Sequence, residues 1–242
     1  MARNISLDAP LDELKDAARA KFGELAFEPV TIGDTTLRFV QVGDMTAYID
    51  KLVAGARGDQ TVQLPLWARI WPTALLMSFL LQRMPLKSDG SLLEVGGGVG
   101  VCGLFAAARG LRSTITDIEP DALLFSRINI LENGLEDRAE VAVADFTTTR
   151  LGKTFDYVVG CEIVYQPKFY ADLAEFLLDH LAPEAHAEIL LAMEIRATTE
   201  QFFQNVKDRV RISRRAMPLP VDCDEGEERI AHVFRMARSG DA

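Results

Sequence analysis

A glycine-rich turn that follows an acidic residue is the part of this chain best suited to bind a ligand. Glu94 ends an apolar stretch, and Gly96, Gly98 and Gly100 follow it at alternate positions. Glycine has no Cβ and takes positive φ without steric cost, so the backbone of such a turn lies close to a ligand. The Glu94 carboxylate would repel a pyrophosphate at short range and attract an amino group or a sulfonium. We therefore expect S-adenosylmethionine, rather than a dinucleotide, at this turn.

The same glycines allow two other interpretations. The spacing Gly98-x-Gly100-x-x-Gly103 also satisfies the dinucleotide-binding fingerprint, which is a weak signal when it stands alone. A nucleotide-dependent oxidoreductase is therefore an alternative, although the chain shows no second half with a glycine turn of its own. An ordinary strand-to-helix turn is the third interpretation, but such a turn rarely needs so many glycines.

Acidic residues also fall where a nucleoside would need them. Asp117 ends the next predicted strand, about 20 residues after the glycines, where a carboxylate accepts hydrogen bonds from both ribose hydroxyls. Glu119 is a second candidate for this role. Its structural alternative is an acid in the first turn of the next helix, where the helix dipole favours a negative charge. After the third strand, Asp145 would accept from the adenine amino group and Phe146 would cover the base. For Asp145 a helix cap is the alternative.

The elements that would position these residues alternate along the chain. From residue 91 onward, apolar runs typical of buried strands take turns with stretches of helical spacing. This pattern predicts an α/β fold with an open, mostly parallel, Rossmann-like sheet covered on both faces. Two final strand patterns, 210–217 and 229–236, predict an antiparallel hairpin. The other predicted strands span 91–95, 113–117, 139–143, 155–160 and 187–193, and the predicted helices span 99–109, 120–132, 170–181 and 200–210.

The residues before this alternation are predicted to form an extension. We expect residues 1–62 to pack as an N-terminal helix and β-hairpin on a ligand-binding domain of residues 63–242. Gly33 marks the hairpin turn, and Pro72 suits the first turn of a helix because its missing N–H is not needed there. The predicted elements are a helix over 12–25, strands over 27–32 and 37–42, a loop over 55–59 and a helix over 72–84.

Composition bounds the class of protein. The chain has 242 residues and a formal net charge of -10, which argues against binding to a nucleic-acid backbone. Residues 1–11 lack the apolar core of a signal peptide, and the apolar runs are far shorter than the ~20 residues that span a bilayer. Cys102, Cys161 and Cys223 show no disulfide or metal spacing. We expect a monomeric cytoplasmic protein that binds no nucleic acid, membrane or metal.

These motifs together resemble a known family. Residues 94–100, Asp117, Asp145 and the segment 155–165 look like the seven-strand, class I S-adenosylmethionine-dependent methyltransferases, over roughly residues 65–235. The chain is most similar to the lysine-methyltransferase-like branch, which carries Asp-x-x-Tyr after the fourth strand and a tryptophan-proline segment before the core. The resemblance implies a C-terminal antiparallel hairpin on the sheet, S-adenosylmethionine as cofactor, and a protein lysine as methyl acceptor.

The resemblance also assigns residues to the site. Glu162 and Tyr165 match the Asp-x-x-Tyr pattern and would hold the acceptor amine and help it lose its proton, with Cys161 beside the cofactor. Trp71, in the tryptophan-proline segment, would also lie near the cofactor. Glutamate in place of aspartate is a departure, because the extra methylene moves the carboxylate by about 1.5 Å. A displacement of that size matters in catalysis.

Three alternatives therefore stay open at this point. Glu162 caps the loop and Tyr165 packs on the core in a purely structural interpretation of the motif. A small amine or another metabolite is an alternative acceptor at the same cofactor site. The glutamate also keeps open a noncatalytic module that binds S-adenosylmethionine without transferring its methyl group.

Overall fold

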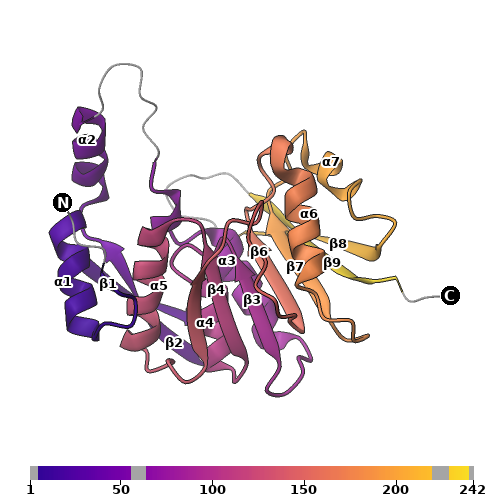
Figure 1. Ribbon diagram of the computed structural model, residues 1–242, viewed down its shortest axis with the longest axis horizontal. Helices are drawn as coiled ribbons and strands as arrows, with labels where there is room; N and C mark the ends of the chain where they lie inside the picture. Colours follow the sequence, from indigo (N-terminus) through magenta and orange to yellow (C-terminus); the bar gives the residue numbers. More distant parts are fainter. Residues whose placement is uncertain (1–4, 56–63, 220–228, 240–242) are drawn as a thin grey trace.

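The computed structural model describes residues 5–55, 64–219 and 229–239, and its centre is a seven-stranded sheet (Figure 1). The strands are β3 (Ser91–Val95), β4 (Arg112–Asp117), β5 (Ala139–Val143), β6 (Tyr157–Cys161), β7 (Glu188–Met193), β8 (Val210–Pro218) and β9 (Ile230–Arg238). Their order is β5-β4-β3-β6-β7-β9-β8, with the first five parallel and β9 antiparallel to both of its neighbours. The predicted α/β fold with a C-terminal antiparallel hairpin is confirmed.

Helices cover both faces of the sheet, because the strands carry apolar residues at consecutive positions. Leu92 and Leu93 are both fully buried, but Leu92 belongs to the core on one face and Leu93 to the core on the other. The first core includes α3 (Pro72–Arg83), α4 (Val101–Ala108) and α5 (Pro120–Glu132), and the second includes α6 (Tyr170–Asp179) and α7 (Thr199–Phe203). Such doubly buried strands are typical of parallel sheets.

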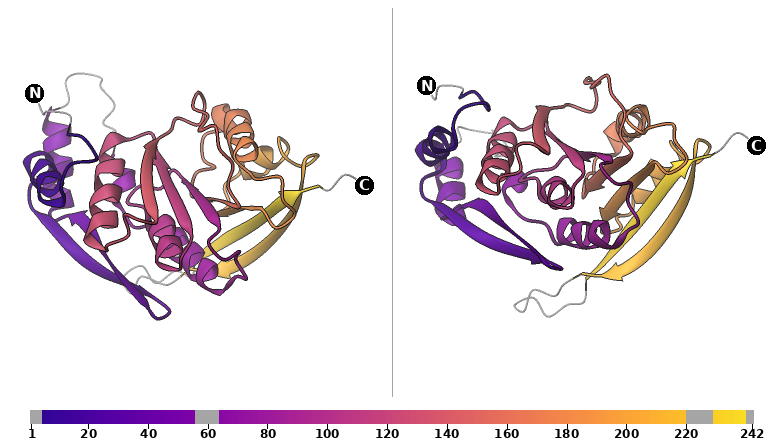
Figure 2. Two further views of the ribbon diagram at one scale, coloured as in Figure 1. Left: turned by 60° about the horizontal axis from the view of Figure 1, so that its bottom comes forward. Right: turned by 90° about the horizontal axis from the view of Figure 1, so that it is seen from below.

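The N-terminal elements lie at the other end of the molecule from β8 and β9 (Figure 2). They are α1 (Leu11–Phe22), β1 (Leu25–Ile32), β2 (Thr35–Val42) and α2 (Met45–Gly55), with β1 and β2 paired as an antiparallel hairpin. They pack on α5: the ring of Phe22 meets that of Phe125 edge-on at 5.2 Å. The Val40 N–H also donates to Oδ1 of the buried Asn129 at 2.7 Å. This end of the chain therefore shares one hydrophobic core with α3–α5.

Two predicted helices are shorter than expected, and one helix was not predicted. The first helix ends at Phe22 instead of residue 25, because Gly23 takes a φ of 85°. The helix predicted over 200–210 is only the short α7, since the Asn205 side chain bonds to the carbonyls of Gln201 and Phe202 and competes with the helix. Sequence reasoning missed α2, although its half-buried residues recur at helical spacing: Met45, Tyr48, Ile49 and Leu52. Most of the predicted 55–59 loop lies outside the described residues.

Candidate active site

The glycine turn joins β3 to α4 at the carboxyl edge of the parallel strands. Gly96 and Gly98 take φ angles of 62° and 56°, and Gly100 caps α4 at 82°. A Cβ on Gly98 would lie 2.7 Å from the carbonyl oxygen of Trp67, and a Cβ on Gly96 would lie 2.9 Å from the Ile163 side chain. The bare backbone therefore lets two segments meet at the turn, one before α3 and one after β6.

Glu94 faces the helix that follows the turn. Glu94 is only 3% exposed. Its two carboxylate oxygens accept from the backbone N–H groups of Cys102 at 3.1 Å and Gly103 at 2.8 Å. These groups belong to the first turn of α4, where N–H groups have no intrahelical partner. Burial raises the pKa of Glu94 to about 7. The carboxylate thus holds the turn against α4, and its contact with a cofactor stays a prediction.

Asp117 also bonds to the turn, and two apolar side chains lie beside it. Its Oδ2 accepts from the Gly98 N–H at 2.9 Å and its Oδ1 from the Glu119 N–H at 3.0 Å, and burial raises its pKa. The next residue, Ile118, is 56% exposed. Val143, which pairs with Asp117 in the β4–β5 register, is 60% exposed. Sequence reasoning missed Ile118 and Val143. The sequence signal that could have found them is an apolar residue at the point where each strand leaves the core.

Asp145 and Phe146 follow β5 at the same edge. The Asp145 Oδ1 accepts from the N–H of Thr147 at 2.9 Å and from its hydroxyl at 2.7 Å, and these bonds lower the pKa of Asp145. One oxygen therefore serves a local turn, as in the capping alternative, although no helix begins there. The Phe146 ring packs edge-on against Phe169, with centroids 6.1 Å apart. Contacts of these two residues with a base stay predictions.

Glu162 is held by the end of the neighbouring strand, β7. Its backbone takes a φ of 55°, which is uncommon outside glycine. Its Oε1 accepts from the Glu194 N–H at 2.9 Å, and its Oε2 accepts from the Arg196 guanidinium at 3.0 Å. Burial raises the pKa of Glu162, while these two contacts oppose the rise. Sequence reasoning missed Glu194 and Arg196, although charged residues directly after the apolar β7 run were a visible signal.

The remaining predicted residues lie around this edge. Tyr165 is 51% exposed, so it does not pack on the core as the structural alternative required, and its hydroxyl bonds to no described residue. Cys161 donates to the Thr73 carbonyl at 3.7 Å, and its sulfur lies 3.8 Å from that of Cys102. Trp71, two residues before Thr73, donates from its indole N–H to the Leu66 carbonyl at 3.0 Å. The start of α3 thus meets the end of β6.

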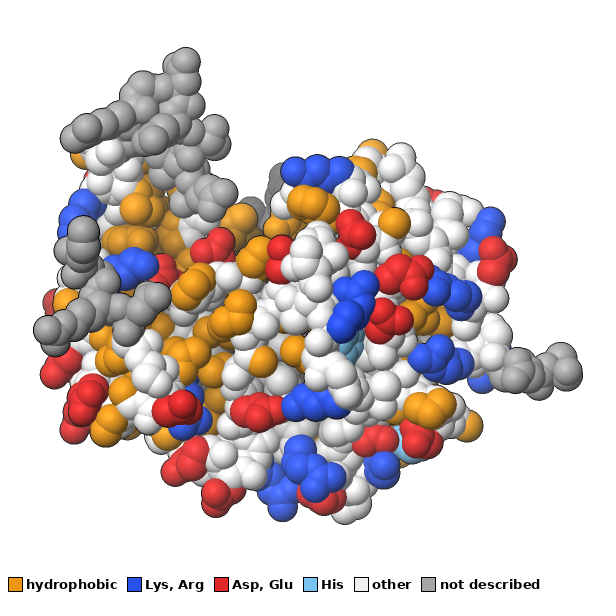
Figure 3. Space-filling view, viewed as in Figure 1, with side chains coloured by type: hydrophobic (Ala, Val, Ile, Leu, Met, Phe, Trp, Pro, Cys, Tyr) orange, Lys and Arg blue, Asp and Glu red, His pale blue; other side chains and the backbone are white. Residues whose placement is uncertain are grey.

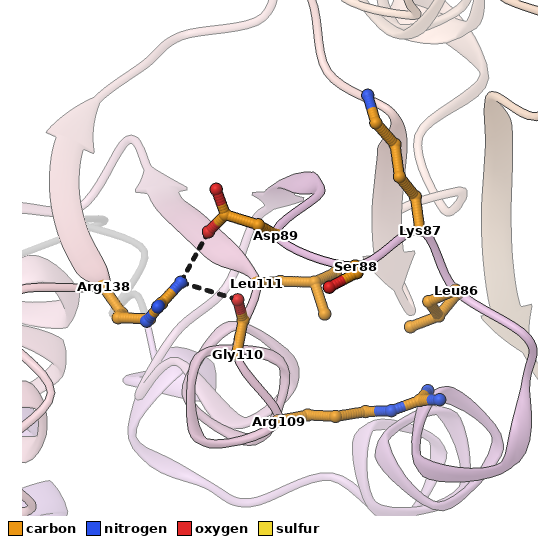
Figure 4. Close-up of a pocket in the computed structure, with 8 residues that line it drawn as sticks. All are labelled: Leu86, Lys87, Ser88, Asp89, Arg109, Gly110, Leu111 and Arg138. Carbon is orange, nitrogen blue, oxygen red and sulfur yellow. Dashed lines mark hydrogen bonds and ion pairs between the residues drawn. The ribbon is translucent and has the colours of Figure 1, made fainter.

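A cavity of about 480 Å³ lies away from all of these residues, among the loops that lead into β3, β4 and β5 (Figure 4). Arg138 spans it to Asp89 at 2.7 Å, and Arg109 donates to the Leu81 and Met84 carbonyls. Because these loops precede the strands, the cavity opens at the amino edge of the sheet, opposite the glycine turn. The lining residues are Leu86, Lys87, Ser88, Asp89, Arg109, Gly110, Leu111 and Arg138.

The described residues form neither a metal-ion cluster nor a membrane-spanning helix. Among residues 5–55, 64–219 and 229–239, no three His, Cys, Asp or Glu side chains gather in a group that could hold a metal ion. None of the helices in these ranges has the length and apolar character needed to cross a bilayer.

In Figure 3, hydrophobic side chains gather between α2 and the helical core, whereas acidic and basic side chains intermix near α6 and α7.

Comparison with known proteins places the chain in a family. The Xenopus tropicalis protein N-lysine methyltransferase METTL21A is 30% identical over 146 residues, which cover 58% of this chain and 66% of that relative. The Mus musculus EEF1A lysine methyltransferase 3 is 32% identical over 146 residues, covering 57% of this chain and 61% of that relative. The chain thus spans about two thirds of the length of these relatives.

The fold and a family model agree with these relatives. A Streptococcus mutans structure described as a S-adenosylmethionine-dependent methyltransferase superposes with a TM-score of 0.60 at 14% identity, covering 89% of this chain and 57% of that one, which shows the fold. The family model described as lysine methyltransferase matches residues 59–209. The resemblance to class I methyltransferases of the lysine-methyltransferase branch is confirmed, and the chain belongs to the lysine methyltransferase family.

Proposed function

We propose that this chain transfers a methyl group from S-adenosylmethionine to the side-chain amine of a lysine in a protein substrate. The family and the relatives named for protein lysine methylation support this acceptor. The observation that carries the proposal is the placement of Glu162. Its backbone is in a left-handed conformation, a form of strain that tends to be kept at functional sites, and the next residue, Ile163, packs against Gly96 of the glycine turn.

The residues around the turn suit S-adenosylmethionine. A nucleoside needs a carboxylate for its ribose hydroxyls and an apolar surface for its base. Asp117 supplies the first, and the exposed side chains of Ile118 and Val143 supply the second at adjacent strand ends. On this proposal Asp145 and Phe146 meet the base. The turn itself, with Glu94, Gly96, Gly98 and Gly100, holds the amino-acid part of the cofactor near Trp71 and Cys161.

The acceptor amine must reach the methyl group as a neutral nucleophile. When bound, S-adenosylmethionine supplies a methyl group on a positively charged sulfur, which the lone pair of the amine displaces in line. A lysine with a pKa of ~10.4 is neutral in only about one molecule in a few thousand at pH 7, which corresponds to about 4–5 kcal/mol. Glu162 binds the ammonium form at the lip of β6. The exposed Tyr165 lies three residues on, where its hydroxyl helps to orient the amine as the ammonium proton passes to solvent water.

Glu162→Gln tests the proposal at its centre. We expect the variant to bind S-adenosylmethionine as the wild type does, because Gln still accepts from the Glu194 N–H. We expect methyl transfer to protein to fall by about 100-fold or more, because the amide carries no charge to hold an ammonium. Binding is measured by calorimetry, and transfer by incorporation of labelled methyl from the cofactor into a cell extract.

The matched control is Glu188→Gln, at the opposite end of β7, where Glu188 pairs with Arg235. Its methyl transfer should equal that of the wild type. The extract is separated into protein and small-molecule fractions after the reaction. Label in the small-molecule fraction alone would replace the protein acceptor by a metabolite. Cofactor binding without label in either fraction would leave a noncatalytic binding module, and binding of NAD in place of S-adenosylmethionine would overturn the cofactor assignment.

The organisation around this activity is also proposed. The N-terminal part, residues 1–62, forms an extension on a methyltransferase domain of residues 63–242, and it contributes to the substrate-facing surface. The shared core of α1, β2 and α5 supports the packing of this extension. From composition we further propose a monomeric cytoplasmic enzyme that does not bind nucleic acid.

A further inference from the structure

The carboxylate of Glu162 has two oxygens with different kinds of partner. Oε1 accepts from the backbone N–H of Glu194, a group fixed at the end of β7. Oε2 accepts from the side chain of Arg196, 34 residues away in sequence. The backbone contact holds Oε1 in place, because it joins residues that directly follow two adjacent parallel strands. The guanidinium therefore occupies the oxygen that is left for another cation.

The two sides of this ion pair differ in their exposure. The Glu162 side chain is only 12% exposed, whereas that of Arg196 is 44% exposed. A shielded carboxylate is strongly disfavoured without a cationic partner. An arginine with so much of its side chain in water is held only weakly in an ion pair. Exchange of the guanidinium for another cation is therefore easy, whereas its loss without replacement is not.

The surroundings let the Arg196 side chain leave while its backbone stays in place. The Arg196 N–H donates to the Thr199 hydroxyl at 2.9 Å, and Thr199 is 1% exposed. Among the described residues, the carboxylate of Glu194 also lies near Glu162, and it accepts from the Arg229 guanidinium. With Arg229 on Glu194, a departing Arg196 side chain moves into solvent, and Glu162 is left for the incoming charge.

We infer that Arg196 is a stand-in for the acceptor: its guanidinium occupies the position on Glu162 that the lysine ammonium takes when substrate binds. This inference rests on the proposed function, and it adds that the free enzyme holds its own competitor for the acceptor site. Arg196 is thus a positioning residue that sets how tightly an acceptor binds. The exchange keeps the charge at Glu162 balanced throughout.

Three variants separate this role from a structural one. Arg196→Gln removes the competing charge, Arg196→Lys keeps it, and Arg235→Gln removes a similarly exposed arginine from the ion pair at the far end of β7. For a protein that the wild type methylates, we expect Arg196→Gln to lower KM about three- to fivefold, the size of an exposed ion pair, with kcat nearly unchanged. Methylguanidinium chloride should raise the KM of this variant back toward the wild-type value. Arg196→Lys and Arg235→Gln should keep that value.

A binding measurement keeps this inference apart from the proposed function. The Glu194 N–H donates to Glu162, so its NMR signal reports on the carboxylate during titration with n-butylammonium chloride, a lysine side-chain probe. We expect saturation at a several-fold lower concentration in Arg196→Gln than in the wild type or Arg235→Gln. Equal saturation, or a higher KM in Arg196→Gln, would overturn the inference even if methylation is normal. Tighter probe binding in a protein that methylates nothing would show that Arg196 competes with an ammonium group at Glu162 and would reject the proposed function.

Discussion

Asp117 serves the protein and, on our proposal, the cofactor with the same carboxylate. Its oxygens accept from the N–H groups of Gly98 and Glu119, so it already shapes the glycine turn before any ligand arrives. Each oxygen has a second lone pair, which leaves the carboxylate able to accept from ribose hydroxyls at the same time. The negative charge strengthens both sets of bonds.

Asp117→Asn should therefore weaken binding of S-adenosylmethionine about 10- to 100-fold. The amide removes the charge and turns one acceptor into a donor that faces an N–H group, and hydrogen bonds to charged groups are worth about 1.5–3 kcal/mol. Calorimetric titration with S-adenosylmethionine measures the change. Asp121→Asn on α5, which removes an exposed ion pair with Lys21 of α1, is the control and should bind as the wild type does. Equal affinities for the two variants would remove Asp117 from the cofactor site.

At the scale of an element, α4 begins on a buried carboxyl group. Glu94 accepts from two N–H groups of its first turn, yet burial raises the Glu94 pKa from 4.5 to about 7. A group whose pKa is higher in the folded state stabilises the fold below its unfolded pKa, and that contribution is lost as pH rises through the folded value. The attachment of α4 to β3 should therefore weaken between about pH 4.5 and 7.

Comparison with Glu94→Gln isolates this effect, because Gln does not ionise. The free energy of unfolding of the wild type, relative to the variant, should fall as pH rises from 5 to 8, by up to about 3 kcal/mol at 1.36 kcal/mol per pKa unit. Urea unfolding at several pH values measures it, with the exposed Glu136→Gln as control for the substitution. A wild-type-to-variant difference that stays constant across this range would contradict the buried, proton-binding Glu94.

At the scale of the whole molecule, α5 connects the N-terminal hairpin to the ligand turn. Asn129, which is fully buried, accepts from the Val40 N–H of β2 at 2.7 Å and donates to the Val99 carbonyl of the turn at 3.0 Å. One helical turn later, Asn133 makes two bonds to the backbone of Arg38 in a solvent-exposed setting. The two asparagines thus make similar bonds in different surroundings.

Asn129→Ala should lower the free energy of unfolding by about 2–4 kcal/mol, because it leaves a buried donor and a buried acceptor unpaired, at about 1–3 kcal/mol each. Asn133→Ala should lower it by less than about 1 kcal/mol, since water replaces the lost bonds. Urea unfolding of both variants measures the difference. If the two variants lost the same stability, the buried connection between hairpin and turn would not be a determinant of the fold.

The sequence by itself determined the order of the elements and the location of the ligand edge. The bounds of α5 and β5 agree with prediction residue for residue, because Pro120 and the Asn133-Gly134 stop are local signals that act through the backbone. The positive φ angles of the glycine turn follow in the same way from residue type. The carboxyl ends of parallel strands share one edge of the sheet. The sequence alone therefore predicted that Asp117 and Glu162 lie at the same edge.

Only the tertiary structure decided which partner each of these side chains has. Glu94, expected at the mouth of the turn, bonds to α4, and Glu162 pairs with Arg196 across two strands. Such contacts join residues that come together only after the strands have paired in register. The sequence of β6 or of β7 alone does not indicate that these two strands are neighbours in the sheet. Local periodicity therefore gave the scaffold and its functional edge, whereas the charge arrangement at that edge emerged from long-range packing.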